Sequence, residues 1–243
     1  MSKHVLVLPD GSYRYRLHHA QGLSGYLTLH ANQRTQHFIE IGSSQFFLSA
    51  DNRWLFKFSP SKYSPHQRWF KWMLRDVLST RLMGKYDARR EYKSARVLAR
   101  LGQQTVRCYG YGMPTRLANP LGSLYVMEYM GDAVSGREHM ARLDEDSREH
   151  FFDRVMEWVI ALARAGYAHR DLHLGNLMVT AQEDLVWIDT HVRRLPRQRA
   201  RRAHALTRMI DAEKLGGTDF AERAMSRLRC ALPELFSTSE RQA

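Results

Sequence analysis

Short apolar runs separated by turn residues dominate the first half of the chain. QFFLS at 45–49 and RWLFKFS at 53–59 flank the turn signal ADN, and HFIEI precedes them. Runs of this length bounded by Gly, Ser, Asn and Asp predict strands, here in an antiparallel meander. Further strands are predicted at 104–112 and 123–130. The polar, aromatic and basic composition of residues 1–35 favours loosely packed strands and turns.

Helical periodicity characterises two longer segments. Over residues 87–101 apolar side chains recur at i, i+3, i+4 and i+7, with Asp87 as an N-cap and Gly102 as a stop. Residues 147–165 carry a broad apolar stripe and end at Gly166. After this helix, LMV and LVWI enclose the turn TAQED and predict a hairpin.

The strand-rich first part and the helix-rich second part predict an α+β protein with two lobes. We expect residues 1–130 to form a first lobe built on an antiparallel sheet, with the helix at 87–101 and an insert at 59–86. Residues 131–243 would form a smaller helical second lobe. A chain of 243 residues can bury a sizeable core.

The stretch HRDLHLGN at 169–176 concentrates ionisable and amide groups between a helix and a strand. LMV leads away from Asn176 and LVWI returns toward Asp189, so a hairpin would bring these two oxygen ligands to the same end. Such ligands suit a hard cation such as Mg²⁺. Asp171 would lie beside a metal-bound phosphate, where a carboxylate can accept a hydroxyl proton. The alternative is that Asp171 and Asn176 only cap turns.

Two earlier residues favour the same chemistry. Strand alternation places Lys57 on the face opposite Phe56 and Phe58, and a lysine among apolar neighbours needs a partner. Glu91 is the acidic member of the otherwise apolar stripe of the helix at 87–101. The two side chains would pair and hold nucleotide phosphates. The alternative is a surface glutamate and a lysine whose ammonium reaches solvent.

The catalytic loop, as we call residues 169–176, resembles the H-R-D-x-x-x-x-N loop of the protein-kinase-like superfamily. WIDT stands where that superfamily has its metal-binding D-F-G, and LYVMEYM resembles the strand and hinge between its lobes. The resemblance implies a kinase-like fold that places these groups around one magnesium–nucleotide cluster. The implied roles are catalytic base for Asp171, metal ligands for Asn176 and Asp189, phosphate contact for Lys57, orientation of Lys57 for Glu91, adenine contacts for Glu128 and Met130, the back of the pocket for Met127, and support of the loop for His169.

The chain departs from the kinase pattern in its phosphate loop and after the metal aspartate. GSS at 42–44 is the candidate phosphate loop, with backbone N–H groups of Ser43 and Ser44, although it can equally be a plain hairpin turn. The triplet that starts at Asp189 is Asp-Thr-His, so the D-F-G glycine is absent. Because 54 residues follow Asp189, too few for a peptide-binding lobe, we expect a small or glycan acceptor.

The long insert after the lysine strand, the segment ARREYKSARVLARLG and the short C-terminal part are similar to the bacterial lipopolysaccharide kinase family. Members of that family phosphorylate heptose or Kdo in the lipopolysaccharide inner core. The resemblance implies ATP as the donor, Mg²⁺ as the cofactor and heptose as the leading acceptor. HRDLHLGN is also similar to choline-type and aminoglycoside phosphotransferases. A small-molecule kinase therefore stays an alternative, as does a non-catalytic pseudokinase at a membrane surface.

The formal net charge of +12 indicates phosphate-rich partners. Residues 59–90 carry eight Lys or Arg against two Asp, and residues 193–202 carry six Arg. We expect these stretches to face the phosphorylated glycan or an anionic membrane surface, the alternative being a solvated face. The charge alone would also suit nucleic acid, but no nucleic-acid motif accompanies it, so no specific nucleic-acid partner is expected.

Cysteine usage and hydrophobic run lengths indicate the compartment. Cys108 and Cys230 lie far apart without metal-type spacing, which favours a reducing environment. The VLVL run near the start is too short for a secretory segment, and no stretch of about 18 apolar residues occurs. We expect a cytoplasmic enzyme bound peripherally to the inner face of the inner membrane.

Overall fold

The computed structural model describes residues 1–33, 35–36, 44–60, 84–116 and 119–236. The chain divides into two compact units. Unit 1 comprises Met1–Lys93 and Val106–Gly131, and unit 2 comprises Ser94–Thr105 and Asp132–Ala243. Each unit has its own hydrophobic core.

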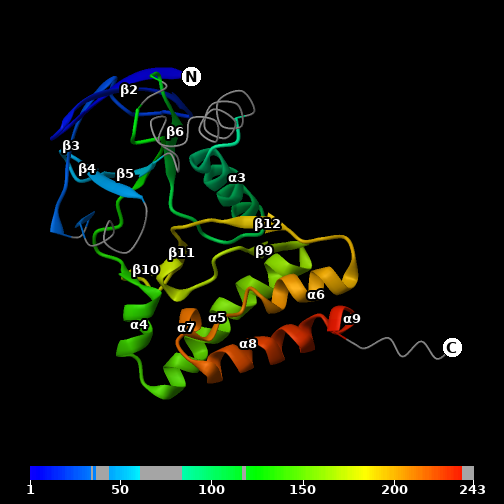
Figure 1. Cartoon of the computed structure of the whole chain (residues 1–243). Helices are drawn as coiled ribbons and strands as arrows, with labels where there is room; N and C mark the ends of the chain where they lie inside the picture. The colour runs from blue at the N-terminus through cyan, green and yellow to red at the C-terminus, as the bar shows by residue number, and fades with distance from the viewer. Residues whose placement is uncertain (34, 37–43, 61–83, 117–118, 237–243) are drawn as a thin grey trace. The chain divides into compact units, whose positions relative to one another are not determined.

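A closed β-barrel forms the centre of unit 1 (Figure 1). Within the described residues its strands are β1 (Ser2–Leu8), β2 (Gly11–His18), β3 (Tyr26–His30), β4 (Gln45–Ser49), β5 (Trp54–Ser59), β6 (Cys108–Pro114) and β7 (Ser123–Glu128). Their order around the barrel is β1-β2-β6-β7-β5-β4-β3. The strands expected at 45–49, 53–59, 104–112 and 123–130 are present as β4 to β7, whereas HFIEI lies outside the described residues.

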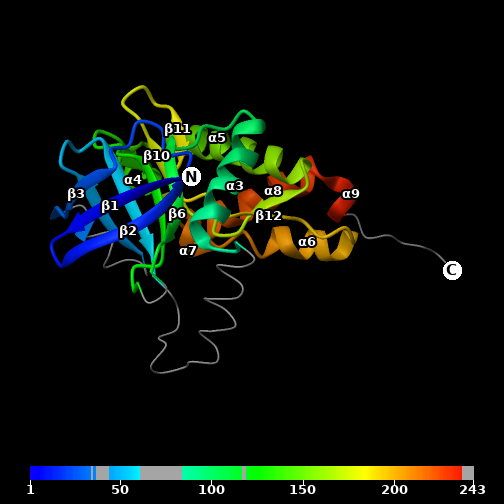
Figure 2. The ribbon, with the colours of Figure 1, turned by 90° about the horizontal axis from the view of Figure 1, so that it is seen from above.

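Residues 1–35, expected as loosely packed strands and turns, contribute β1, β2 and β3. Strand β1 pairs antiparallel with β2 and parallel with β3, with Val5 opposite Tyr26 (Figure 2). The other neighbouring strands of the barrel pair antiparallel, as expected. The parallel pair closes the barrel, and closure satisfies strand edges that would otherwise remain open.

Alternation along β5 decides which side chains fill the barrel. Phe56 and Phe58 are fully buried in the barrel core, together with leucines of β1, β2 and β3. Lys57 lies between them in the sequence and therefore points to the opposite face. The hydrophobic filling of the barrel fixes β5 and, with it, the direction of the lysine.

Of the insert predicted at 59–86, residues 61–83 lie outside the described residues. Helix α3 (Asp87–Arg100) follows this insert. The Ala88 N–H at its start donates to the Ser123 hydroxyl at 3.3 Å. At its end Gly102 adopts a left-handed φ of 74°, and the Gln103 N–H donates to the Leu98 carbonyl at 3.1 Å. Gly102 thus ends the helix as predicted.

The expected first lobe, 1–130, included all of this helix, but α3 is divided between the units. Its residues up to Lys93 belong to unit 1, and those from Ser94 onward to unit 2. Leu98 is fully buried in the core of unit 2. The Ser94 hydroxyl accepts from the Val192 N–H at 3.1 Å within the same unit. Through these contacts the second half of α3 packs as part of unit 2.

Gly112 allows two strands of the barrel to approach closely. It faces Leu17 across the β2–β6 pair. A Cβ atom at this position would lie 1.9 Å from the Arg16 carbonyl oxygen. Because the obstacle is backbone rather than a side-chain tip, any larger residue would push the strands apart.

Unit 2 is mainly helical, with short strands (Figure 1). Within the described residues it also contains β8 (Val134–Ser135), α4 (Gly136–Arg142), α5 (Glu145–Arg164), β9 (Tyr167–His169), η2 (Leu174–Asn176), β10 (Leu177–Val179), β11 (Leu185–Trp187), β12 (Val192–Arg194), α6 (Arg199–Thr207), α7 (Ala212–Leu215), α8 (Thr218–Ala231) and α9 (Pro233–Phe236). The barrel and these helices together confirm the α+β class. None of the helices in the described part of the chain has the length and hydrophobicity needed to cross a membrane.

Helix α5 organises the core of unit 2. The Asp144 side chain caps its start by accepting from the Ser147 N–H at 2.9 Å. One face of the helix buries a stripe that ends near the Gly166 stop, whose φ is 82°. On the outside, ion pairs Arg223–Glu149 and Arg227–Asp153 connect α8 to α5. The helix therefore supports β9, which follows it directly and leads into the catalytic loop.

A buried polar chain anchors the strand that precedes Asp189. The Trp187 indole N–H donates to the Gln103 side-chain oxygen at 3.0 Å, and the Gln103 amide donates to the Trp158 carbonyl at 2.7 Å. Trp187 is fully buried and Gln103 is 3% exposed. These two hydrogen bonds satisfy the buried indole N–H of Trp187 and connect it to α5, so β11 is held at the end that leads to Asp189.

Candidate active site

Unit 1 contributes a buried ion pair between β5 and α3. The Lys57 ammonium lies 3.1 Å from each carboxylate oxygen of Glu91. Lys57 is 7% exposed and Glu91 is 2% exposed. The structure thus brings together the two residues that the sequence paired, although 34 positions separate them.

This pair is costly to bury and therefore informative. Removing two charges from water costs several kcal/mol each, and their mutual attraction offsets that cost only with good geometry. The symmetric contact of the ammonium with both carboxylate oxygens provides such geometry. A buried ion pair is weak support for stability, so a functional use of the lysine is the better explanation.

Strand β7 ends in the segment expected to contact adenine. Met127 is 4% exposed, and Glu128 is exposed at the end of the strand. The Glu128 N–H donates to the Arg107 carbonyl at 3.0 Å. A contact of Glu128 with adenine would therefore use its carbonyl oxygen. Met130 follows as a half-buried residue outside the strand.

The predicted phosphate loop is described only in part. Ser43 lies outside the described residues. Ser44 is half-buried and directly precedes β4. Its neighbour Gln45 pairs with Phe58 at the far end of β5. The proposed backbone contact of Ser43 and Ser44 with phosphate stays a prediction.

Unit 2 contributes the catalytic loop, which connects β9 to β10. At its start the Arg170 N–H donates to the His191 carbonyl at 2.6 Å. Near its end the Asn176 side-chain amide donates to the Asp171 carbonyl at 2.8 Å. Asn176 is 6% exposed. The amide nitrogen of Asn176 is thus used to shape the loop, which leaves its Oδ1 as the atom that can bind a cation.

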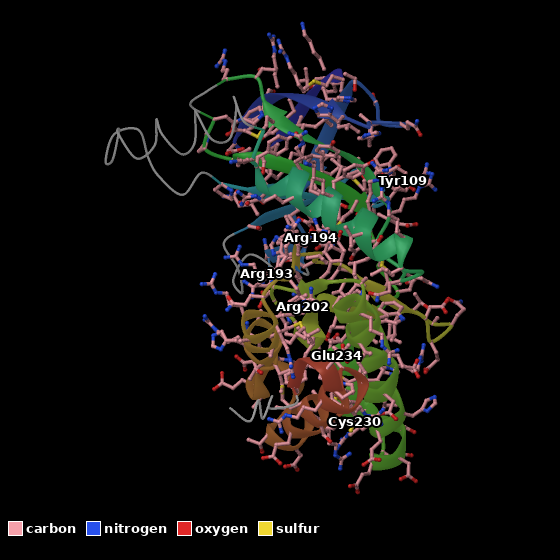
Figure 3. The ribbon with its side chains drawn as sticks, turned by 90° about the vertical axis from the view of Figure 1, so that its right-hand side faces the viewer. Tyr109, Arg193, Arg194, Arg202, Cys230 and Glu234 are labelled. Atoms are coloured by element: carbon pink, nitrogen blue, oxygen red, sulfur yellow. The ribbon has the colours of Figure 1, made fainter. Side chains whose placement is uncertain are left out.

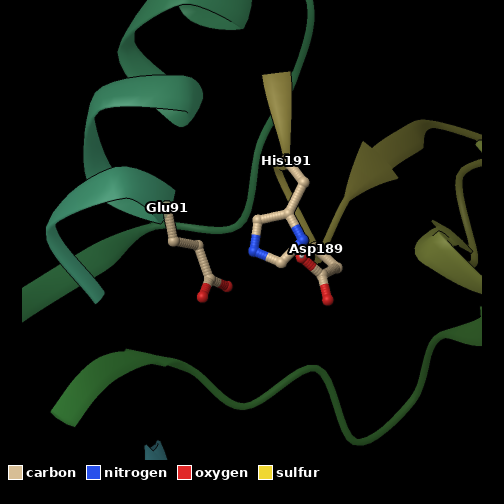
Figure 4. Close-up of side chains that lie close together, drawn as sticks. All are labelled: Glu91, Asp189 and His191. Carbon is tan, nitrogen blue, oxygen red and sulfur yellow. Dashed lines mark ion pairs between the residues drawn. The ribbon is translucent and has the colours of Figure 1, made fainter. Parts of the chain in front are cut away.

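The β10–β11 hairpin brings the predicted metal ligands to one end, as the sequence indicated. Leu177 pairs with Trp187 at the open end of the hairpin. The Ile188 N–H then donates to the Asn176 carbonyl at 3.0 Å, so Asp189 comes next along the chain. Asp189 and His191, shown in Figure 4, lie with His191 Nδ1 3.3 Å from Asp189 Oδ1.

A lysine that the sequence did not single out contacts the predicted base. Lys214 Nζ on α7 lies 2.6 Å from Asp171 Oδ1. His173 Nε2 lies 3.8 Å from the other oxygen, Oδ2. The segment DAEKLGG around Lys214 has recognisable helix caps, but nothing in it indicates a partner 43 positions away.

These neighbours set the charge state of Asp171. Partial burial raises the pKa of its carboxyl group, but the hydrogen bond and charge of Lys214 and the charge of His173 outweigh burial, so the net pKa is lowered. The negative charge of Asp189 also raises the pKa of the Asp171 carboxyl group, but less than Lys214 and His173 lower it. Asp171 is therefore ionised at neutral pH, as a proton acceptor must be.

His169 supports the catalytic loop through the backbone of Asp189 and the ring of Trp187. Its Nε2 donates to the Asp189 carbonyl at 2.9 Å, and its ring stacks on Trp187 with centroids 4.6 Å apart. Burial lowers the pKa of His169 to about 4, with the Asp189 carbonyl acting in the opposite direction. The neutral, enclosed ring fits a structural role.

The donor set of unit 2 fits a hard divalent cation. Asn176 Oδ1 and the Asp189 carboxylate follow two paired strands, and the Asp171 carboxylate lies on the same loop as Asn176. Carboxylate and amide oxygens are the ligands that Mg²⁺ prefers. Within the described residues, the structure thus groups Asp171, Asn176 and Asp189 in unit 2, and Lys57 with Glu91 in unit 1.

Comparisons with known proteins relate this arrangement to one family. A profile described as "Lipopolysaccharide kinase (Kdo/WaaP) family" matches residues 59–229, which include α3, the catalytic loop and Asp189. A search of curated proteins gives no match. The solved structure titled "WaaP in complex with acyl carrier protein" aligns with a TM-score of 0.49 at 19% identity, covering 85% of this chain and 81% of that chain. "Glucosamine kinase in complex with glucosamine, ADP and inorganic phosphate" aligns with a TM-score of 0.44 at 12% identity, covering 91% and 68%.

Proposed function

The chain belongs to the lipopolysaccharide kinase (Kdo/WaaP) family, and on this premise we propose that it transfers the γ-phosphoryl group of ATP to a heptose hydroxyl of the lipopolysaccharide inner core. One observation carries the proposal. The ionised Asp171 lies on the loop that also presents Asn176, and the β10–β11 hairpin returns Asp189 to the same place.

The groups of unit 2 would act on the acceptor and the cation. Asp171 accepts the proton of the attacking sugar hydroxyl. Asn176 Oδ1 and the Asp189 carboxylate would hold the cation, and His169 keeps the Asp189 backbone in place. When bound, Mg²⁺ would neutralise negative charge on the phosphates. Most of the rate enhancement in such a reaction comes from positioning and electrostatics.

The groups of unit 1 would hold the nucleotide. Lys57 contacts the α and β phosphates, and Glu91 directs its ammonium through the 3.1 Å contacts. The carbonyl of Glu128 and the main chain of Met130 contact adenine, with Met127 at the back of the pocket. Ser43 and Ser44 add backbone N–H groups to the phosphates. Each of these contacts follows the protein-kinase-like pattern that the sequence resembles.

The surroundings of Asp171 favour a neutral or anionic acceptor over a cationic one. The Lys214 ammonium lies 2.6 Å from one oxygen of this carboxylate. A cationic aminoglycoside or choline-like acceptor would meet a positive charge at the reacting centre, which opposes binding. A sugar of the lipopolysaccharide core has no such conflict.

The direct test uses purified protein, ATP, Mg²⁺ and core oligosaccharide that lacks heptose phosphate. We expect a mass increase of one phosphate per acceptor, located on heptose by fragmentation. Asp171→Asn should reduce transfer by about 10²- to 10⁴-fold while the protein stays folded. Asp184→Asn serves as the control because Asp184 is an exposed carboxylate in the β10–β11 turn.

The outcomes separate the rival functions. Transfer to an aminoglycoside or choline but not to the core would exchange the acceptor and keep the reaction. Binding of Mg²⁺–ATP without turnover to any acceptor or to water would identify a pseudokinase. Activity of Asp171→Asn near the native rate would remove Asp171 as the base.

The same proposal includes a location at the cytoplasmic face of the inner membrane. Arg193 and Arg194 are exposed at the end of β12 (Figure 3). Helix α6 begins at Arg199 and contains further arginines. Basic side chains near an anionic leaflet contribute roughly 1 kcal/mol each. Sedimentation with anionic vesicles, lost in high salt and absent with neutral vesicles, is the expected result.

A further inference from the structure

Lys214 makes a short contact with the proposed base and has no role in the kinase pattern described above. Its ammonium lies 2.6 Å from Asp171 Oδ1. The contact connects α7 to the catalytic loop within unit 2. A lysine placed on the base itself can influence the reaction in a way that an ordinary surface lysine cannot.

The backbone around Lys214 is fixed on both sides. The Asp211 side chain caps α7 by accepting from the N–H groups of Glu213 at 3.1 Å and Lys214 at 3.4 Å. Gly216 ends the helix with φ 97°. Leu215, the next residue after Lys214, is fully buried. A helix of one turn would not be stable alone, so these caps and this anchor hold it.

The same packing holds α7 and the catalytic loop. Leu215 and Leu174 belong to one buried cluster, which also includes Met140 of α4. A Cβ at Gly216 would lie 3.8 Å from the Leu174 side chain. Because Leu174 begins the turn of η2 inside the catalytic loop, the position of Lys214 is linked to the position of Asp171.

The two oxygens of Asp171 have different surroundings. Oδ1 accepts a charge-assisted hydrogen bond from Lys214. Oδ2 has His173 Nε2 at 3.8 Å, beyond hydrogen-bond distance. One oxygen is therefore held, and this contact fixes the rotation of the carboxylate while its other oxygen stays suited to accept a proton.

We infer that Lys214 is a positioning residue for phosphoryl transfer, because it holds Asp171 Oδ1 and so directs Oδ2 at the acceptor hydroxyl. This inference rests on the proposed function. As the acceptor oxygen bonds to the γ-phosphorus, its proton moves to Asp171 Oδ2 and the bond from that phosphorus to the leaving oxygen of ADP breaks. Lys214 itself exchanges no atom in this step.

The alternative is an ordinary surface ion pair, and the two differ in what they affect. Lys214 and Asp171 are 44% and 43% exposed in their side chains, so the pair should contribute little to folding. A positioning role would change turnover and leave stability and nucleotide binding almost unchanged. Measurements of rate, affinity and unfolding on the same variants therefore distinguish them.

The test compares Lys214→Met, Lys214→Arg and the control Arg208→Met in the full chain. Arg208 is an exposed cation at the end of α6, so its variant removes the same charge. We expect Lys214→Met to lower kcat about 10- to 100-fold, since small misplacements of reacting groups have effects of this size. Lys214→Arg should restore most of the loss, and Arg208→Met should match the wild type.

Three further readouts define the role. The Mg²⁺–ATP dissociation constant from calorimetry and the midpoint of thermal unfolding should be unchanged in Lys214→Met. In the Asp171→Asn background, adding Lys214→Met should give no further loss, because the residue acts through Asp171. Hydrolysis of ATP by water, measured without acceptor, should fall by the same factor as transfer.

Specific results overturn the inference. A Lys214→Met rate within twofold of the wild type, a rate increase, or a raised KM for ATP at constant kcat would each reject a positioning role. If the wild type hydrolyses ATP but does not phosphorylate the core sugar, the proposed acceptor fails and the hydrolysis rates still decide the role of Lys214. If the wild type does neither, both proposals fall.

Discussion

His169 Nε2 donates to the carbonyl oxygen of Asp189 at 2.9 Å, which joins the start of the catalytic loop to the residue that follows β11. The ring is enclosed, and burial lowers its pKa to about 4. The contact fixes the geometry of the loop, whereas the burial of the ring makes the fold sensitive to acid.

The burial of His169 predicts loss of stability in mild acid. The folded-state pKa of His169 lies below its ordinary value of 6.5, so the unfolded chain binds the proton more readily. The stabilisation is complete above about pH 6.5 and is lost as the pH falls toward 4, amounting to about 3 kcal/mol. Urea unfolding between pH 7.5 and 4.5 measures it. His169→Gln, which keeps a donor, should flatten this dependence, whereas His204→Gln on the exposed side of α6 should not.

The Lys57–Glu91 pair predicts an asymmetry between single and double substitutions. Glu91→Gln removes the negative charge beside Lys57, which is 7% exposed, and should cost about 3–5 kcal/mol in urea unfolding. The double variant Lys57→Met, Glu91→Leu removes both charges and should recover most of that loss, although it cannot bind phosphate. Asp87→Asn removes the exposed partner of Arg90 on the same helix and should cost under about 1 kcal/mol. Equal losses for Glu91→Gln and Asp87→Asn would contradict this interpretation.

The two side-chain atoms of Asn176 have different proposed roles, so two substitutions should separate their effects on the loop and on cation binding. Asn176→Asp keeps an oxygen ligand but loses the amide that donates to the Asp171 carbonyl, so kcat should fall with a modest change in the Mg²⁺ requirement. Asn176→Ala loses both and should raise the half-saturating Mg²⁺ concentration at least about tenfold, since even outer partners of metal ligands change affinity by this amount. A Mg²⁺ titration at saturating ATP checks both. Identical Mg²⁺ curves for wild type and Asn176→Ala would remove Asn176 from the cation site.

The close approach of β2 and β6 at Gly112 predicts that a larger residue there lowers the free energy of unfolding by steric overlap. Gly112→Ala places a Cβ against the Arg16 carbonyl oxygen and should cost about 1–3 kcal/mol, because the paired strands must move apart. Gly25→Ala is the matched control, since a Cβ there meets nothing within 4 Å; its effect should be within about 0.5 kcal/mol. Thermal unfolding of both variants decides whether close approach of β2 and β6 matters for the barrel.

Features that depend on neighbouring residues were predicted from the sequence. The hairpin at β10 and β11 and the stop at Gly102 are present as predicted, because each depends on residues within one turn or one strand pair. Strand alternation also gave the direction of Lys57. The parallel pairing of β1 with β3 and the division of α3 were not predicted. Both depend on contacts between segments far apart in the chain.

The sequence by itself predicted the longer strands and helices, the H-R-D-x-x-x-x-N loop and the candidate residues for binding phosphate and cation, since apolar periodicity and turn chemistry are short-range properties. Tertiary structure alone decided that the barrel closes and that Lys214 meets Asp171. The physical reason is that α7 is held beside the loop by its caps and by the burial of Leu215, and burial depends on what the rest of unit 2 packs against it.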